Sequence, residues 1–193
     1  MKQKTKKAGG KRREVRLSGF GGQGIVLAGS ILGKAIVLFE GRNAVFTQNY
    51  GPEARGGSCS ADLVVSDEAI HYPKVMRPDV LVLMSEEART NHAPGIGPET
   101  VVLYDEDLVR GRELQGRGSR LFAIPATRFA EELGRKMVAN IVMLGFLAAV
   151  TRIVGHDPLQ KAILASVPKG TEELNASAFE KGYQYGEAAR GGS

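Results

Sequence analysis

The residues whose types and spacing most clearly suggest ligand binding form a glycine-rich run near the N-terminus: Gly19, Phe20, Gly21, Gly22, Gln23 and Gly24. An apolar run at residues 15–17 precedes them, and apolar residues at helical spacing follow at residues 25–39. A strand, a glycine loop and a helix N-terminus in this order present backbone N–H groups to an anion such as a phosphate. Gly19, Gly21 and Gly24 fit the G-x-G-x-x-G spacing, which is weak evidence by itself.

The sequence around this glycine loop argues against a dinucleotide site. Such a site needs an acidic residue at the end of the second strand, where it binds the ribose hydroxyls. The second predicted strand ends at Thr47, and Glu40 precedes that strand, at its wrong end. Gln23 is unusual at its position, and no Gly-Lys-Ser/Thr follows, as a P-loop requires. Two interpretations stay equally open: a site for a phosphate or carboxylate, and close helix–strand packing without a ligand.

Catalytic and metal-binding groups are scarce in the remaining sequence. His71, His92 and His156 stand alone, without the spacing of a metal site. Cys59 lies among small residues of a predicted strand, which favours a buried, unreactive thiol over a nucleophile. A single cysteine also excludes an internal disulfide and an iron–sulfur cluster held by this chain alone. We therefore predict no catalytic residue and no metal ligand.

A second polar segment, residues 48–57, is too irregular for a helix or a strand. Its candidate binding residues are Tyr50, Glu53, Arg55 and Gly56. Arg55 could bind a phosphate or carboxylate with two hydrogen bonds, or it could pair within the chain with Glu53 or Asp62. Both interpretations of Arg55 stay open, and Tyr50 could stack or hydrogen-bond at the same edge.

The elements that must position these residues alternate along the chain. Apolar runs predict strands at residues 15–17, 43–47, 58–65, 80–84, 101–104 and 121–124. Helical patterns occupy residues 22–39, 127–133, 137–154, 157–167 and 175–190, with another helix starting at residue 85. Asp157 and Asn175 are the predicted N-caps of the last two helices, and residues 58–65 alternate like a half-exposed antiparallel strand. Together these patterns predict an α/β fold: a three-layer, Rossmann-like, mostly parallel sheet with one antiparallel strand pair and a C-terminal helical cover.

The formal net charge of +5 is concentrated at the N-terminus. Residues 1–13 contain seven basic and no acidic residues, and the remaining chain has 19 basic against 21 acidic residues. We expect residues 1–13 to be a disordered tail, residues 14–190 to be a single domain, and residues 191–193 to be a short tail. An RNA- or surface-binding module driven by the tail is a minor alternative, so a nucleic-acid partner is unlikely on this composition. Because no signal peptide or membrane-spanning run is visible, we expect a cytoplasmic protein without a membrane partner.

Several segments together resemble the gamma subunits of 2-oxoacid:ferredoxin oxidoreductases. They are the glycine loop, the Thr-Gln-Asn-Tyr-Gly-Pro-Glu-Ala-Arg-Gly-Gly run at residues 47–57, Tyr72-Pro73, Pro78-Asp79-Val80, and the surroundings of Asn140 and Asn175. The resemblance covers about residues 14–185. The sequence of these segments is most similar to that of the 2-oxoglutarate branch, while the aryl-glyoxylate and other 2-oxoacid branches stay open.

The resemblance implies a subunit of an enzyme that oxidatively decarboxylates a 2-oxoacid to an acyl-CoA and passes electrons to ferredoxin. It places thiamine diphosphate, Mg²⁺ and the iron–sulfur clusters on partner subunits of the alpha, beta and delta types, with CoA as co-substrate. The gamma subunit would pack beside the thiamine site and assist CoA access. Asn140, a polar residue in an apolar helix, is expected to satisfy a buried backbone group and to brace the glycine loop. A free-standing nucleotide-binding oxidoreductase is the alternative.

Overall fold

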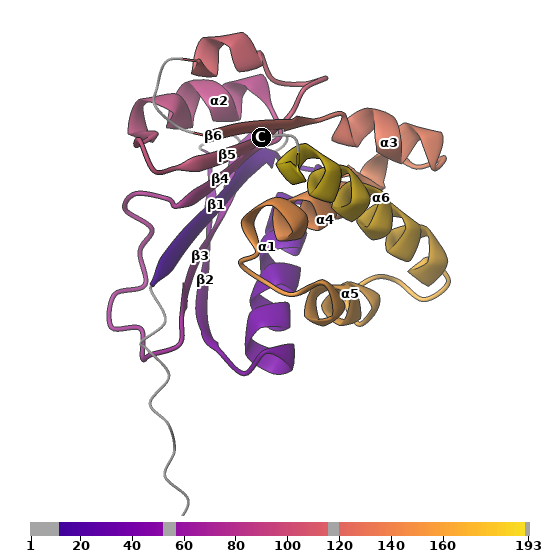
Figure 1. The fold of residues 1–193 in the computed structure, drawn as a ribbon, viewed down its shortest axis with the longest axis horizontal. Coiled ribbons are helices and arrows are strands. Elements are labelled where there is room, and N and C mark those ends of the chain that lie inside the picture. Colours follow the sequence, from indigo (N-terminus) through magenta and orange to yellow (C-terminus); the bar gives the residue numbers. More distant parts are fainter. Residues whose placement is uncertain (1–11, 52–56, 116–119, 192–193) are drawn as a thin grey trace, which may run out of the picture.

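The computed structural model describes residues 12–51, 57–115 and 120–191 of the 193-residue chain. A six-stranded sheet in the order β2-β3-β1-β4-β5-β6 forms its centre, with helices on both faces (Figure 1). The strands are β1 (Arg13–Phe20), β2 (Asn43–Tyr50), β3 (Ser58–Ser66), β4 (Val80–Leu83), β5 (Val101–Asp105) and β6 (Arg120–Ile124). The predicted α/β fold with a mostly parallel sheet is confirmed.

One strand, β3, runs against the others. It pairs antiparallel with β1 and with β2, whereas β1, β4, β5 and β6 pair in parallel. The predicted antiparallel pairing is confirmed, but the prediction that β3 is half-exposed is wrong. Asp62, on its polar face, is 4% exposed because it accepts hydrogen bonds from Nε and Nη2 of Arg16 on β1, at 2.7 and 2.6 Å.

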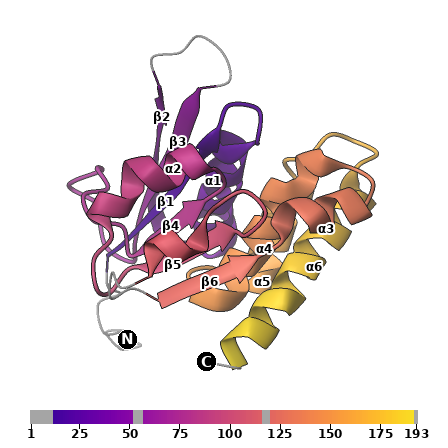
Figure 2. The ribbon, with the colours of Figure 1, turned by 90° about the horizontal axis from the view of Figure 1, so that it is seen from above.

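Most helices cover one face of the sheet, and one α-helix with two 3-10 segments lies on the other (Figure 2). The larger core lies under α1 (Ile25–Lys34), its π-helical continuation η1 (Ala35–Phe39), α3 (Ala126–Glu132), α4 (Ala139–Thr151), α5 (His156–Leu164) and α6 (Glu172–Gly191). The smaller core lies under α2 (Glu86–His92) and the 3-10 segments η2 (Ala93–Gly95) and η3 (Gly111–Leu114). A third 3-10 segment, η4 (Lys136–Val138), leads into α4. Among the helices of the described residues, none combines the length and the apolar character needed to cross a membrane.

Helices α4 and α6 cross with their backbones in contact. A Cβ atom added at Gly182 of α6 would lie 1.9 Å from the carbonyl oxygen of Val142, and one added at Gly145 of α4 would lie 2.1 Å from that of Phe179. Both distances are far below van der Waals contact, so only glycine allows this separation of the helices. The crossing anchors the C-terminal cover to α4, which also contacts the glycine loop.

Two predicted helix starts differ from the structure. Helix α5 starts at His156, so Asp157 lies in its first turn and Gly155 is the capping residue. Helix α6 starts before Asn175, whose Nδ2 donates back to the carbonyl oxygen of Thr171 at 2.8 Å, one turn upstream. The asparagine therefore satisfies a backbone group of the helix from inside it rather than capping it.

The structured part of the chain also begins earlier than predicted. β1 starts at Arg13, and the Arg12 guanidinium donates to the carbonyl oxygens of Tyr72 and Lys74 at 2.5 and 3.0 Å. Both arginines were predicted to belong to the basic tail. The remaining tail prediction, residues 1–11, lies outside the described residues.

A polar cluster between α5 and α6 should make stability depend on pH. His156 Nε2 lies 3.0 Å from Glu180 and Nδ1 lies 2.9 Å from Asp157, against the ring of Phe179. Burial, the largest single influence, lowers the pKa of His156, but hydrogen bonds to Glu180 and Asp157 together outweigh it and leave the pKa raised. The same contact with His156 lowers the pKa of Glu180.

We expect this ion pair to stabilise the fold most between pH 4.5 and 6.5, the ordinary pKa values of Glu180 and His156. The contribution of His156 is complete below its unfolded pKa and is lost as pH rises through the raised folded pKa; that of Glu180 is lost as pH falls through its lowered pKa. His156→Gln should lower the free energy of unfolding by about 0.5–1 kcal/mol at pH 5.5 and by less at pH 8.5, measured by urea denaturation. An equal loss at both pH values would contradict the ion pair.

Candidate functional site

The best-placed site lies at the carboxyl ends of β1 and β4. After β1 the chain crosses through α1 toward the β2 side of the sheet, and after β4 it crosses through α2 toward β5. In open α/β sheets ligands bind where the direction of winding changes in this way. The glycine loop follows β1 directly and therefore lies at this point.

The glycine loop is closed by the side chain of Gln23. Its Oε1 accepts from the backbone N–H of Phe20 at 2.6 Å, and its Nε2 donates to the carbonyl oxygen of Met84 at 2.7 Å. The amide thus joins the end of β1 to the residue after β4. A Cβ at Gly19 would lie 2.4 Å from Gln23 Oε1, so this glycine is required by close packing.

The remaining glycines of the loop differ from Gly19. Gly22 and Gly24 have positive φ values of 98° and 72°, and no described residue accepts a hydrogen bond from their N–H groups. The N–H of Gly21 donates to the carbonyl oxygen of Gly57 at 2.9 Å, which links the two predicted loops. Gly19 and Gly24 are both required by close packing, to Gln23 and to Asn140, whereas a Cβ on Gly22 would meet nothing within 4 Å. Anion binding by the N–H groups of Gly22 and Gly24 stays a prediction.

A crevice of about 360 Å³ opens beside the loop. It is lined by Gly22, Gln23, Met84, Leu108, Thr127, Lys136, Met137 and Ala139. Its walls are largely apolar and Lys136 supplies a positive charge; the contact of Lys136 with Glu131 is 3.4 Å long and largely exposed to solvent. The arrangement suits a partly apolar ligand with an anionic group.

The sequence patterns did not indicate the residues of this crevice beyond the loop. Thr127, Lys136 and Met137 all follow β6, the last parallel strand, near its carboxyl end. The rule that carboxyl ends of parallel strands meet at one edge would have pointed to this segment. Met137 is 79% exposed, which an apolar residue at the start of a buried helix does not suggest.

Asp105 supports one wall of the crevice through its hydrogen bonds to Thr127. Its fully buried carboxylate accepts hydrogen bonds from the N–H and Oγ1 of Thr127, at 2.9 and 2.6 Å, and from the N–H of Asp107. Burial raises the pKa of Asp105, although the hydrogen bonds from Thr127 oppose the shift. The carboxylate joins the end of β5 to the start of α3 and holds Thr127, which lines the crevice, in place.

Asn140 connects the loop to α4, as predicted. Its side chain is buried, and Nδ2 donates to the carbonyl oxygen of Gly24 at 3.1 Å. A Cβ on Gly24 would lie 2.3 Å from this nitrogen. Asn140 therefore links the end of the loop, just before α1, to the start of α4.

The second predicted loop is described only at its two ends. Tyr50, the last residue of β2, is 64% exposed, and Gly57 contacts the glycine loop. Glu53, Arg55 and Gly56 lie outside the described residues. Asp62, the alternative partner of Arg55, already accepts two hydrogen bonds from Arg16.

The surroundings of two other potentially reactive groups shift their pKa values. Cys59 is 5% exposed and burial raises the pKa of its thiol, which confirms the predicted buried cysteine. Burial, reinforced by the nearby Arg16, lowers the pKa of His92, whose Nε2 lies 3.1 Å from Ser18 Oγ. Within residues 12–51, 57–115 and 120–191, no three His, Cys, Asp or Glu side chains gather to hold a metal ion.

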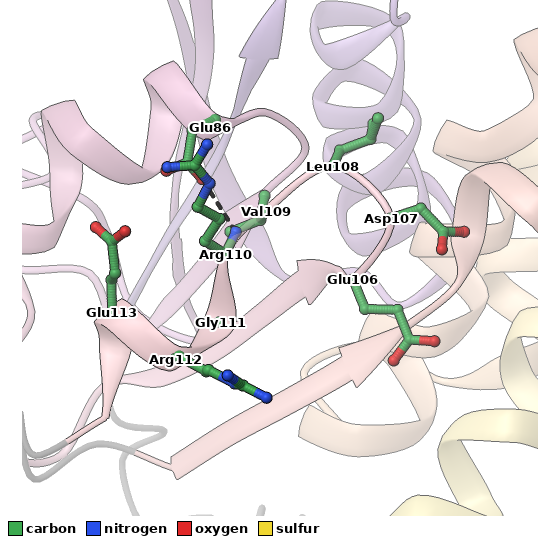
Figure 3. A pocket seen from close by; sticks show the side chains of 9 residues that line it. All are labelled: Glu86, Glu106, Asp107, Leu108, Val109, Arg110, Gly111, Arg112 and Glu113. Carbon is green, nitrogen blue, oxygen red and sulfur yellow. Dashed lines mark hydrogen bonds between the residues drawn. The ribbon is translucent and has the colours of Figure 1, made fainter.

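A larger cavity, of about 610 Å³, lies between α2 and the β5–β6 connection (Figure 3). Its lining carries both charges: Glu86 accepts from the N–H of Arg110 at 3.0 Å, and Asp107 pairs with Arg128 outside the lining. It contacts neither the glycine loop nor Asn140. The crevice at the carboxyl ends of β1 and β4 is therefore the better candidate.

Comparison with known proteins finds similar sequences and a similar fold. A family model for pyruvate ferredoxin/flavodoxin oxidoreductase matches residues 14–185. The 2-oxoglutarate synthase subunit KorC of Methanocaldococcus jannaschii is 53% identical over 174 residues, which cover 90% of this chain and 93% of that protein. The keto/oxoacid ferredoxin oxidoreductase gamma subunit of Geobacter sulfurreducens superposes with a TM-score of 0.81 at 36% identity, covering 92% of this chain and 99% of that one. The ketoisovalerate oxidoreductase subunit VorA of Methanothermobacter thermautotrophicus is 35% identical over 136 residues, 70% of this chain but 28% of that protein.

Proposed function

Because the chain belongs to the pyruvate ferredoxin/flavodoxin oxidoreductase family, we propose that it is the gamma subunit of an enzyme that converts 2-oxoglutarate and CoA to succinyl-CoA and CO2, with ferredoxin as electron acceptor. That it is a subunit of an oxidoreductase acting on 2-oxoacids follows from the family and its relatives. The choice of 2-oxoglutarate rests on one observation, the 53% identity to a 2-oxoglutarate synthase subunit across 93% of its length.

The redox and thiamine chemistry is assigned to partner subunits of the alpha, beta and delta types. An iron–sulfur cluster needs several cysteine ligands, and this chain has one cysteine, which is buried. Among the described residues, no three His, Cys, Asp or Glu side chains gather, and the proposal therefore places thiamine diphosphate and its Mg²⁺ on the partner subunits as well.

The crevice is proposed to assist the entry of CoA. Lys136 and the N–H groups of Gly22 and Gly24 could bind a phosphate, and the apolar wall around Met84 and Met137 could contact the pantetheine arm. Tyr50, Glu53, Arg55 and Gly56 are proposed to act at the same edge, since Gly57 contacts Gly21. Gln23 and Asn140 hold the loop in shape.

Purification of the tagged chain from its native source, with mass spectrometry of the proteins that accompany it, tests the subunit assignment. We expect thiamine- and cluster-bearing chains to accompany it, and 2-oxoglutarate to be preferred over pyruvate and 2-oxoisovalerate by the assembled enzyme. An isolated chain with full activity would instead support the free-standing nucleotide-binding oxidoreductase. Gln23 argues against that alternative, because its side chain already uses the Phe20 N–H.

Lys136→Met in the assembled enzyme tests the proposed role in CoA entry. We expect the KM for CoA to rise about tenfold, with kcat changed much less, because one charge-assisted contact contributes about 1.5 kcal/mol. Lys169→Met, on the α5–α6 connection, is the matched control and should leave both constants unchanged. Arg55→Ala should raise the same KM if Arg55 binds phosphate. Unchanged CoA kinetics in both Lys136→Met and Arg55→Ala would reject CoA entry and leave the subunit assignment standing.

A further inference from the structure

The two loops of the candidate site leave the sheet at one point, where the ends of β1, β2 and β3 meet. Cys59 of β3 lies opposite Gly19 of β1 in one antiparallel ladder and opposite Tyr50 of β2 in the other. Beyond these residues, the N–H of Gly21 donates to the carbonyl oxygen of Gly57 at 2.9 Å and joins the two loops. We call Gly19, Tyr50 and Cys59 the strand junction, because its alignment determines how the two loops lie relative to each other.

A chain of buried side-chain hydrogen bonds ends at the strand junction. Ser18, which is fully buried, donates through Oγ to the carbonyl oxygen of Cys59 at 3.3 Å, and Nε2 of His92 lies 3.1 Å from the same Oγ. A serine hydroxyl has one hydrogen, and because this hydrogen is directed to Cys59, the Oγ atom accepts a hydrogen bond from Nε2 of His92. Burial, followed by the charge of Arg16, lowers the pKa of His92, while Asp62 opposes the shift. The ring is therefore neutral at pH 7, and Nε2 carries its one N–H.

Helix α2 is linked at both of its ends to the residues that flank the glycine loop. Just before the helix, the carbonyl oxygen of Met84 accepts from Nε2 of Gln23 at 2.7 Å. At the last residue of the helix, His92 meets Ser18, which directly precedes the strand junction. Figure 1 shows α2 and α1 on opposite faces of the sheet. The loop is thus held from one face by Asn140 of α4 and from the other by α2.

We propose that His92 is a positioning residue: by donating to Ser18 it holds the strand junction in place and thereby keeps the glycine loop beside Gly57. His92 acts through Ser18 rather than on a ligand. Without the Nε2–H group, the Ser18 hydroxyl loses a partner and can rotate away from Cys59, so the junction then depends on its backbone hydrogen bonds alone. The effect on CoA entry rests on the proposed function, whereas the effect on the two loops does not.

Hydrogen exchange in the assembled enzyme tests the effect on the loops. In His92→Leu, which removes the N–H group at similar volume, the amide of Gly21 should exchange about tenfold faster than in the unmodified chain. In His92→Gln, whose amide can supply an equivalent N–H, the exchange should stay close to that of the unmodified chain. Ser18→Ala should have the same effect as His92→Leu, and the double variant should show no further increase. The amide of Val101, which donates to Asp79 at 2.8 Å at the amino ends of the strands, should be unchanged in all of them.

CoA kinetics of the same assembled enzymes test the effect on the site. We expect His92→Leu to raise the KM for CoA about fivefold with a smaller change in kcat, and His92→Gln to restore it. Thr100→Val is the matched control, because Thr100 is 4% exposed and its Oγ1 donates to the carbonyl oxygen of Pro78 at 2.9 Å. This variant loses the same kind of buried hydrogen bond at the opposite end of the sheet and should leave the KM unchanged.

Four outcomes separate the possibilities. Unchanged exchange of the Gly21 amide in His92→Leu would overturn the proposal, as would equally fast exchange in His92→Leu and His92→Gln. A KM raised as much by Thr100→Val as by His92→Leu would also overturn it, because general loss of stability would then explain both. Exchange that is faster in His92→Leu and restored in His92→Gln supports the positioning role; if the KM for CoA is nevertheless unchanged in both His92→Leu and Lys136→Met, the proposed CoA entry fails and the positioning of the loops stands.

Discussion

Gly182→Ala is expected to lower the free energy of unfolding by about 3 kcal/mol, because the added methyl group would have to displace a helix backbone. Its Cβ would lie 1.9 Å from the carbonyl oxygen of Val142, and 2.8 Å from the carbonyl carbon. A backbone cannot rotate aside as a long side chain can, so α4 and α6 must separate. Separation would reduce the packing of Phe146 and Phe179, which are fully buried beside this crossing.

The opposing effect of helix propensity makes this a demanding test. Alanine is favoured over glycine within a helix by about 1 kcal/mol, so packing must outweigh this gain. Gly33→Ala in α1 is the matched control, since its Cβ would meet only Leu63 Cδ2 at 3.5 Å, an ordinary contact. We expect Gly33→Ala to raise the free energy of unfolding by about 0.5–1 kcal/mol. Urea denaturation of both variants measures the difference, and a stabilised Gly182→Ala would show that the helices do not touch as described.

The strands of the parallel half could be predicted because their apolar runs are short. Residues 80–83 form an unbroken apolar run that is too short for a buried helix, and all four are buried in β4. The burial of β3 was predicted less well, because its polar residues suggested that one of its faces is exposed to solvent. Asp62 is buried only because Arg16, 46 positions earlier, lies opposite it in the sheet. No local pattern reports that pairing.

Helix starts were predicted poorly at α5 and α6 because two neighbouring residues could serve as caps. Asp157 and Asn175 have strong capping preferences, yet Gly155 is the N-cap of α5 and α6 already begins at Glu172. The packing of α5 and α6 against the core selects between such alternatives, and that selection depends on the whole fold.

The candidate site could be predicted where a buried side chain requires a hydrogen-bond partner. A buried amide in the apolar α4 must find a partner, and Asn140 found Gly24, 116 positions earlier. Lys136 and Met137 carry no such constraint in the sequence. They join the crevice only because α4 packs beside the loop, which is a property of the assembled fold.

The contact between Gly24 and Asn140 predicts the largest functional effect of a single methyl group. Gly24 has a φ of 72°, and a Cβ there would lie 2.3 Å from Asn140 Nδ2. A left-handed conformation costs a non-glycine residue about 1–2 kcal/mol, and displacing the amide loses a hydrogen bond of about 1 kcal/mol. Gly24→Ala should therefore lower the free energy of unfolding by about 2–3 kcal/mol and move the loop. In the assembled enzyme we expect acyl-CoA formation to fall at least about tenfold if the loop meets CoA.

A double-mutant cycle separates the clash from the backbone strain. Gly22→Ala also has a positive φ, of 98°, but its Cβ would meet nothing within 4 Å, so it should show the strain alone. Asn140→Ala removes the amide that the methyl group added by Gly24→Ala would strike. The combined variant, Gly24→Ala with Asn140→Ala, should therefore be about 1 kcal/mol more stable than the sum of the single losses predicts. Additive losses would mean that Asn140 moves aside freely, and the loop would then depend on Gln23 rather than on α4 for its shape.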